Sequence, residues 1–264
     1  MNLQKAVLTL YSYQRSTLQD HFLVGIDCRA ILLVTVVYLV FILSLPLENL
    51  ETMIWFASYP IIMSQMSNQN YSLVFKRSLI VLPFILFIGI FNPIYEKTEV
   101  FKIGKIVMTN GWLSFITLLL RGILAMQALL IVINISGFIK ICNSLRRLGL
   151  PKVLTIQLYM IYRYLGLLME EAMTMRMASL SRGYGKKSFP LKIWTSFVGS
   201  LLIRSYERSK HIYNAMLARG YQGSIPIGSP DLWKWKDSVF FLAWITVFTL
   251  LYFVDLSKIL FQSV

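Results

Sequence analysis

Two arginines, Arg182 and Arg219, lie in a repeated sequence that could recognise a carboxylate on another protein. ASLSRGYG, which begins at Ala178, aligns without gaps on AMLARGYQ, which begins at Ala215, and five of the eight positions are identical. A guanidinium group presents its N–H donors in a rigid fork and can hold a carboxylate through two parallel hydrogen bonds. The repeat therefore predicts two binding tips of similar chemistry.

Each copy taken alone also has a purely structural explanation. A cation in the last turn of a helix stabilises it by about 0.3 to 1 kcal/mol, and Gly is the common residue where a helix ends. Capping, however, requires neither the Tyr after the Gly nor the Ala four residues before the Arg. Because both copies keep these residues, we favour docking.

The sequence offers little for catalysis or metal binding. Glu170 and Glu171 are adjacent and would point about 100° apart on a helix, so they do not form a working carboxylate pair. The polar part of the chain has no Asp-rich pattern, phosphate-binding glycine loop or Ser-His-Asp set. With only two histidines and two distant cysteines, we predict no catalytic residue, cofactor or metal on this chain. A lipid-modifying membrane enzyme remains a remote alternative.

The composition indicates an integral membrane protein. Of 264 residues, 56% are hydrophobic and 14% charged, and the mean hydropathy is +0.63. The formal net charge of +14 must lie outside the lipid. This charge and the two Arg-Gly pairs would suit nucleic-acid binding, but the apolar spans and the lack of RGG repeats argue against it.

We expect about five transmembrane helices, since each needs roughly 20 mostly apolar residues. They cover approximately residues 30–47, 52–66, 78–91, 119–138 and 239–254. Arg121 would cost about 2.5 to 3.5 kcal/mol at the centre of the bilayer. We therefore expect the fourth span to begin near Leu119, with Arg121 in its first turn and its charge among the headgroups. The alternative is a buried, functional arginine.

The basic residues indicate the orientation of the chain. Residues 139–237 hold 16 of the 26 Lys and Arg residues and five acidic residues, which places this segment in the cytoplasm by the positive-inside rule. The short loop with Lys76 and Arg77 lies on the same side, whereas Glu48 and Glu51 lie on the opposite side. We expect a cytoplasmic N-terminus and an extracytoplasmic C-terminus.

The chain divides into an N-terminal membrane region, 1–138, a cytoplasmic domain, 139–237, and a last span with the C-terminus, 238–264. Apolar residues recur at helical spacing in the middle segment, which predicts two long amphipathic helices. The first follows Gly149 and Pro151, and the second runs from near Pro190 toward Arg219. The expected fold is an all-α polytopic membrane protein with this helical domain inserted before its last span.

The two tips resemble the Ala-Arg-Gly signatures of the transmembrane T component of energy-coupling factor transporters. LRRLGLPKVL, YRYLGLLMEEAMTMRMASLSRG and RSYERSKHIYNAMLARGYQG are similar to the CbiQ family, the branch for cobalt uptake, with nickel-handling relatives nearby. The likeness is specific over about 145–223 and extends weakly to IDCRAIL at the first span. It departs at Ala30, where a basic residue is expected soon after Arg29, and at Ser181, which replaces Ala.

This resemblance implies a non-catalytic coupling subunit of an ATP-driven importer in a prokaryotic plasma membrane. The implied partners are two ATPase subunits (CbiO-like), which carry ATP and Mg²⁺, and a substrate-capture membrane subunit (CbiM-like, with or without a small CbiN-like subunit). The implied cargo is cobalt for cobalamin biosynthesis. Nickel, or capture subunits for several vitamins that share one T component, are alternatives.

The resemblance also implies roles for particular residues. Those expected to dock the ATPases are Ser181, Arg182, Gly183, Ala218, Arg219 and Gly220. Those expected to support the coupling helices are Ala178, Ala215, Arg163, Arg204, Glu207 and Arg208.

Overall fold

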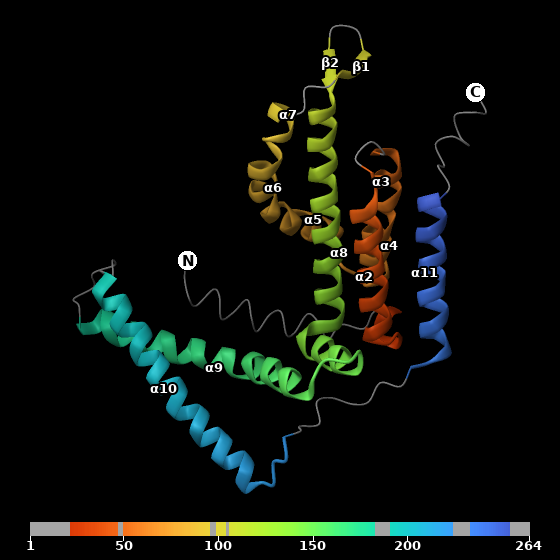
Figure 1. Ribbon diagram of the computed structural model, residues 1–264. Helices are drawn as coiled ribbons and strands as arrows, with labels where there is room; N and C mark the ends of the chain where they lie inside the picture. Colours follow the sequence, from red (N-terminus) through yellow and green to blue (C-terminus); the bar gives the residue numbers. More distant parts are fainter. Residues whose placement is uncertain are drawn as a thin grey trace. The chain divides into compact units, whose positions relative to one another are not determined.

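The computed structural model describes residues 22–46, 50–95, 99–103, 106–182, 191–223 and 233–253. These residues form two compact units. Within helix α8 (Asn110–Arg147), the boundary between the units falls between Gly137 and Phe138. The membrane unit contains the described residues 22–137 and 233–253, and the α9–α10 unit contains the described residues 138–223. The prediction of an all-α polytopic membrane protein is confirmed, with one short β-hairpin among the described residues (Figure 1).

The membrane unit is built mainly from helices. Its elements are η1 (Phe22–Gly25), α2 (Cys28–Ser44), α3 (Leu50–Phe56), α4 (Ser58–Met66), α5 (Tyr71–Ser78), η2 (Leu79–Val81), α6 (Leu82–Gly89), α7 (Asn92–Tyr95), β1 (Glu99–Ile103), β2 (Ile106–Thr109), the first part of α8 (Asn110–Arg147), and α11 (Trp235–Phe253). Strands β1 and β2 pair antiparallel. The α9–α10 unit contains the end of α8, α9 (Lys152–Arg182) and α10 (Leu191–Ala218).

Three helical stretches in the described part of the chain are long and apolar enough to cross a membrane. They are Tyr71–Gly89, Gly111–Arg147 and Trp235–Phe253. Helix α2 is a shorter apolar helix that coincides with the first expected span. The expected third span corresponds to α5, η2 and α6 together, which begin earlier than residue 78. The 3₁₀ segment η2 precedes Pro83, which has no backbone N–H to continue the α-helical ladder.

The second expected span, 52–66, is divided into two short helices. Pro60 lies near the start of α4 and has no N–H to donate to the carbonyl of Phe56, four residues earlier. The hydroxyl of Tyr38 donates to this carbonyl instead, at 3.2 Å. The missing backbone bond is thus replaced by a side chain of α2, which ties the break to the core.

Arg121 lies inside its helix rather than in the first turn, whereas the start of the membrane span near Leu119 stays a prediction. Helix α8 begins at Asn110, so Arg121 lies about three turns inside it. Its Nη2 donates to the carbonyl oxygen of Leu45, the C-cap residue of α2, at 2.6 Å. A cation stabilises the C-terminal end of a helix. The guanidinium therefore binds the end of another helix, which the sequence pattern did not predict.

Aromatic rings hold α11 against the N-terminal helices of the membrane unit. Tyr38 and Tyr59 stack with ring centres 4.4 Å apart, and Trp244 meets Tyr59 edge-on at 4.8 Å. Phe248 is 1% exposed and stacks on Phe56 at 6.0 Å. Among the described residues, α11 thus completes the core that α2 begins.

Polar side chains connect α8 to the helices that precede it. The hydroxyl of Tyr71 donates to Gln127, and the amide of Asn134 donates to the side-chain oxygen of Gln69, at 3.1 and 3.2 Å. Just beyond these contacts the helical path of α8 breaks at Gly137, with φ 67° and ψ 156°. This backbone conformation is essentially restricted to glycine. The break therefore depends on the absence of a side chain.

Candidate coupling site

Local signals in the sequence explain where the two long helices begin and end. Gly149 has φ +113° where α8 terminates, and the N–H of Leu150 donates back to Leu145 at 3.0 Å. The carbonyl of Pro151 then accepts from the N–H of Thr155 at 3.2 Å, which starts α9 at Lys152. An αL glycine and a proline at these positions are typical of a helix stop followed by a helix start.

Helix α10 ends at the second tip. Gly220 has φ +80°, and the N–H of Tyr221 donates to the carbonyl of Met216 at 3.0 Å. This hydrogen bond spans five residues, as in a Schellman motif. Gly220 thus acts as a cap, as the structural explanation requires, but the cap leaves the side chain of Arg219 exposed and available for binding.

Both candidate arginines project from the C-terminal end of a long helix. Ser181 and Arg182 are exposed in the last turn of α9, and Ala218 and Arg219 are exposed at the end of α10. Neither guanidinium has a hydrogen bond or ion pair to another described residue. Gly183 lies outside the described residues.

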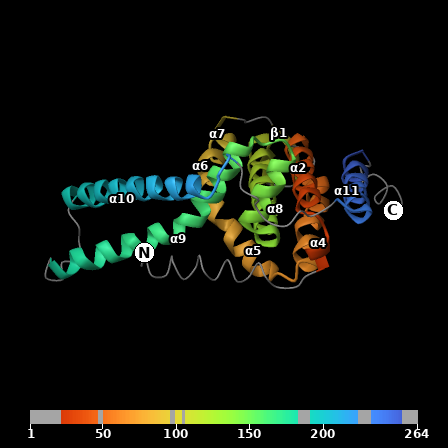
Figure 2. The ribbon, with the colours of Figure 1, turned by 90° about the horizontal axis from the view of Figure 1, so that it is seen from below.

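The two tips lie at different ends of the helix pair. Helix α10 runs back along α9, so the C-terminal end of α9 is near the beginning of α10, whereas α10 ends at the opposite extremity (Figures 1 and 2). With about 1.5 Å of rise per residue, helices of 31 and 28 residues are each more than about 40 Å long. The unit therefore presents its two arginines as separate attachment points.

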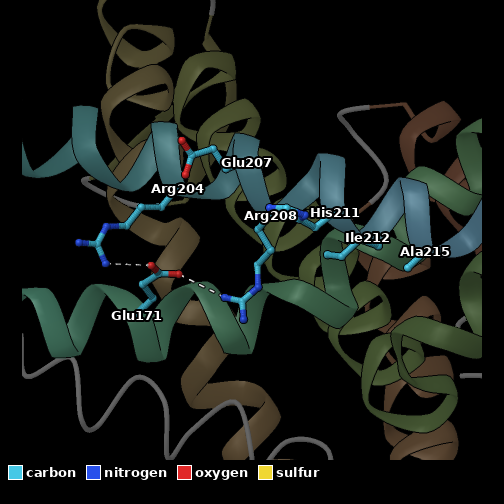
Figure 3. Close-up of a pocket in the computed structure, with 7 residues that line it drawn as sticks. All are labelled: Glu171, Arg204, Glu207, Arg208, His211, Ile212 and Ala215. Carbon is cyan, nitrogen blue, oxygen red and sulfur yellow. Dashed lines mark hydrogen bonds and ion pairs between the residues drawn. The ribbon is translucent and has the colours of Figure 1, made fainter.

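A charged contact joins the two helices between the tips. Arg204 Nη1 donates to Oε1 of Glu171 in α9 at 3.5 Å. Arg208 Nη1 donates to Oε2 of the same carboxylate at 3.3 Å (Figure 3). An open pocket of about 770 Å³ surrounds this contact. Its lining residues are Glu171, Arg204, Glu207, Arg208, His211, Ile212 and Ala215.

This contact fixes geometry more than it adds stability. The side chains of Arg204 and Arg208 are 59% and 45% exposed, and Glu171 is 21% exposed. Exposed ion pairs contribute about 0 to 1 kcal/mol each, because water and salt screen them. One carboxylate that bridges two arginines a helical turn apart nevertheless selects one register of α10 against α9.

The structure brings some of the predicted support residues together. Arg204, Glu207, Arg208 and Ala215 line the pocket, whereas Ala178 is exposed near the end of α9. Arg163 is not among the pocket residues; its guanidinium lies 6.0 Å from the ring centre of its neighbour Tyr164.

Sequence reasoning missed Glu171, because it considered this residue only as a catalytic partner of Glu170. The useful signal was the spacing of Arg204 and Arg208. Two basic residues four positions apart share one face of a helix and favour an acidic residue opposite them.

The described residues contain no group of three or more His, Cys, Asp or Glu side chains placed to hold a metal ion. Cys28 and Cys142 are both buried, and neither forms a disulfide bond among the described residues. Within the part of the chain that the structure describes, the α9–α10 unit offers no set of metal ligands. Its exposed arginines can bind carboxylates.

A unit of apolar helices and a second unit with a pair of long charged helices define a polytopic membrane protein with a polar helical domain. The family model CbiQ, described as cobalt transport protein, matches residues 20–227. The chain belongs to this family, and it is a non-catalytic subunit of a transporter.

The chain is also similar to individual proteins, one of which has a transporter name. The energy-coupling factor transporter transmembrane protein EcfT of Leuconostoc gelidum is 25% identical over 215 residues, covering 76% of this chain and 80% of the relative. An uncharacterised protein of Methanocaldococcus jannaschii is 27% identical over 256 residues, covering 92% of this chain and 86% of that protein. A second uncharacterised protein of the same organism is 26% identical over 149 residues, or 56% of each chain.

Proposed function

We propose that this chain is the T component that links two cytoplasmic ATPase subunits to a membrane subunit that captures the cargo. The observation that carries the proposal is the pair of exposed arginines at opposite ends of the α9–α10 pair, within the region that matches the family. In this proposal Ser181, Arg182, Gly183, Ala218, Arg219 and Gly220 form the two docking tips.

The chemistry of the tips suits attachment to two similar partners. Each guanidinium can hold a carboxylate in a groove of one ATPase, and the small Ala178 and Ala215 leave room for the groove walls. Two modest contacts on one rigid chain give a stronger combined attachment than either contact alone. The excess of basic residues in 139–237 would also attract acidic partner surfaces and anionic lipid.

We propose a cytoplasmic location for the α9–α10 unit and the N-terminus, and an extracytoplasmic C-terminus. The positive-inside rule supports this orientation. A single cysteine placed at position 186, in a chain that lacks Cys28 and Cys142, should resist a membrane-impermeant thiol reagent in intact cells and react after lysis. Labelling in intact cells would contradict the orientation and the docking of cytoplasmic ATPases.

We propose cobalt as the cargo, supported by the description of the family. In that case the ATPases would be CbiO-like and the capture subunit CbiM-like, with or without a CbiN-like subunit. The second candidate function is a T component for other cargoes, such as nickel or vitamins. The similarity to an EcfT protein supports this alternative. Selectivity would lie in the capture subunit, since this chain has few metal-ligating side chains.

Purification of the native complex tests the whole proposal. The chain should be isolated in mild detergent from its own cells, and the bound subunits identified by mass spectrometry. We expect two ATPase subunits per chain and one further membrane protein, whose identity indicates the cargo. A chain that purifies reproducibly without ATPases would contradict the proposed function.

A further inference from the structure

A buried polar cluster joins the beginning of the first apolar helix to the beginning of the last one. It consists of Asp27, Arg29 and Asp237, with Trp233 beside them, all in the membrane unit. Asp27 is 6% exposed and Asp237 1% exposed. Because a buried carboxylate is costly unless each oxygen is bound, the partners of both side chains need to be identified.

Asp237 uses its two oxygens in different ways. Oδ2 accepts the N–H of Lys234 at 2.7 Å, and the N–H of Asp237 donates to the carbonyl of Lys234 at 3.0 Å. The side-chain bond is one half of a capping box, and both bonds are local to the beginning of α11. Oδ1 accepts the N–H of Asp27 at 2.8 Å, across 210 residues of sequence. Helix capping does not require this second contact.

Asp27 and Arg29 complete the connection. Asp27 is the N-cap of α2, and its Oδ1 accepts the N–H of Arg29 at 3.0 Å. Oδ2 of Asp27 accepts hydrogen bonds from Nε and Nη2 of Arg29, at 2.9 and 2.5 Å. The guanidinium carbon of Arg29 lies 5.3 Å from the centre of the Trp233 ring, just before α11. One carboxylate thus caps each helix, and backbone, cation and ring contacts join the two caps.

The position of this cluster in the chain indicates how it could transmit movement. In the order of the chain, this cluster contains the first described residues of the membrane unit after α10. We infer that Asp27, Arg29 and Asp237 form an anchor that holds α11 against α2, so that movement of the α9–α10 unit is transmitted to the membrane unit. The inference rests on the proposed coupling function. Asp237 is then a positioning residue.

The main test compares uptake with ATP hydrolysis in the same preparation. The full complex, reconstituted in lipid vesicles with Asp237→Ala, should keep its ATPases, because the tips at Arg182 and Arg219 are unchanged. The amount of Co²⁺ taken up per ATP hydrolysed should fall about fivefold or more, the lower end of typical coupling between sites. Lys236→Ala is the matched control, since this exposed side chain lies in the same turn of α11; its ratio should equal that of the wild type.

Hydrogen exchange gives a second measurement that needs no transport. The amide N–H of Asp27 should exchange faster in Asp237→Ala than in the wild type, whereas Lys236→Ala should leave it unchanged. If Asp237→Ala does not assemble, Asp237→Asn replaces it. The side-chain amide of Asn has one accepting oxygen, so it can accept from the N–H of Lys234 or from the N–H of Asp27, but not from both. The uptake ratio and the exchange rate of the Asp27 N–H then test the anchor in this variant.

An intact complex with an unchanged uptake ratio would overturn the proposed anchor, and so would unchanged exchange at Asp27. These failures differ from a failure of the proposed function. If the wild-type complex does not couple hydrolysis to uptake, the coupling role is wrong for the wild type itself. The exchange experiment would still report whether Asp237 holds Asp27.

Discussion

The two units of the molecule satisfy their side chains in different ways. In the membrane unit, α11 closes an aromatic core, and Tyr71 and Gln69 bind polar side chains of α8. In the α9–α10 unit, one glutamate and two arginines form ion pairs between the long helices. Helix α10 also exposes a series of large apolar side chains: Trp194, Val198, Leu202, Tyr206, Tyr213 and Leu217. The membrane unit exposes large apolar side chains as well, among them Phe84 and Phe87, and these suit lipid, whereas the apolar side chains on the charged α10 suit contact with other molecules.

The strongest test of this difference removes both tips at once. Arg182→Ala with Arg219→Ala should release the ATPases, since each lost charge pair in a partly desolvated groove costs about 2 to 5 kcal/mol. The membrane unit should stay folded and inserted. Co-purification and uptake assays measure the two effects.

Arg176→Ala with Lys210→Ala is the matched control for this double variant, because it removes the same charge from the same two helices away from their ends. Single variants should each weaken the complex, and unequally, because Ser181 and Ala218 differ. Arg→Lys should restore binding only in part, since an ammonium group lacks the planar fork. ATPases bound in normal ratio to the double Ala variant would show that the tips are only helix caps.

A change in the core of the membrane unit should reduce stability but leave ATPase binding intact. Phe248→Ala should destabilise this unit by about 3 to 5 kcal/mol, because it removes a fully buried ring that contacts Tyr38, Phe56 and Tyr59. Thermal unfolding in detergent measures the loss, and the folded fraction should still bind ATPases. Phe253→Ala, on the same helix but 80% exposed, should have little effect.

The backbone between the units should respond to a single methyl group. Gly137→Ala should cost about 1 to 3 kcal/mol, because its φ and ψ lie where L-residues are strained. Gly166→Ala should do the opposite and stabilise α9 by about 0.5 to 1 kcal/mol, since Gly166 is helical and a Cβ there meets no atom within 4 Å. Thermal shifts of equal sign would contradict this explanation.

The smallest effect is expected at Glu171. A double-mutant cycle of Glu171→Ala with Arg208→Ala should give a coupling energy below about 1 kcal/mol that decreases as salt is added. A salt-independent value of several kcal/mol would mean that the contact belongs to a buried network and that the α9–α10 unit resembles the membrane unit after all.

Features of the fold that depend on neighbouring residues could be predicted from the sequence. Gly149 and Pro151 indicate the start of α9, and the Arg-Gly pair at 219–220 indicates the end of α10, because each signal acts within one helical turn. The apolar spans follow from composition alone, and so does the class of membrane protein. In the same way, the repeat of the two tips is evident in the amino-acid sequence itself, although their role stays a proposal.

Features that depend on distant residues could not be predicted in this way. The place of Arg121 inside α8 is explained by its contact with Leu45, and the hydrogen bond that Pro60 cannot make is replaced by a hydroxyl from α2. Glu171 and Asp237 were noticed as acids, but their partners lie 33 and 210 positions away. Local spacing indicates which face of a helix a residue lies on, but it does not identify the distant residue that meets this face.

The contact between Asp27 and Asp237 also has a consequence for how the protein is made. Chains fold from the N-terminus as they are synthesised, so α2 is made before the whole α9–α10 unit is translated. Until α11 arrives, the N–H of Asp27 lacks its acceptor, and Tyr59 and Tyr38 lack Trp244 and Phe248. A chain truncated before Trp235 would therefore lack the acceptor of the Asp27 N–H and the rings that pack on Tyr38 and Tyr59. The packing of α2 and α4 is thus completed only when α11 has been synthesised.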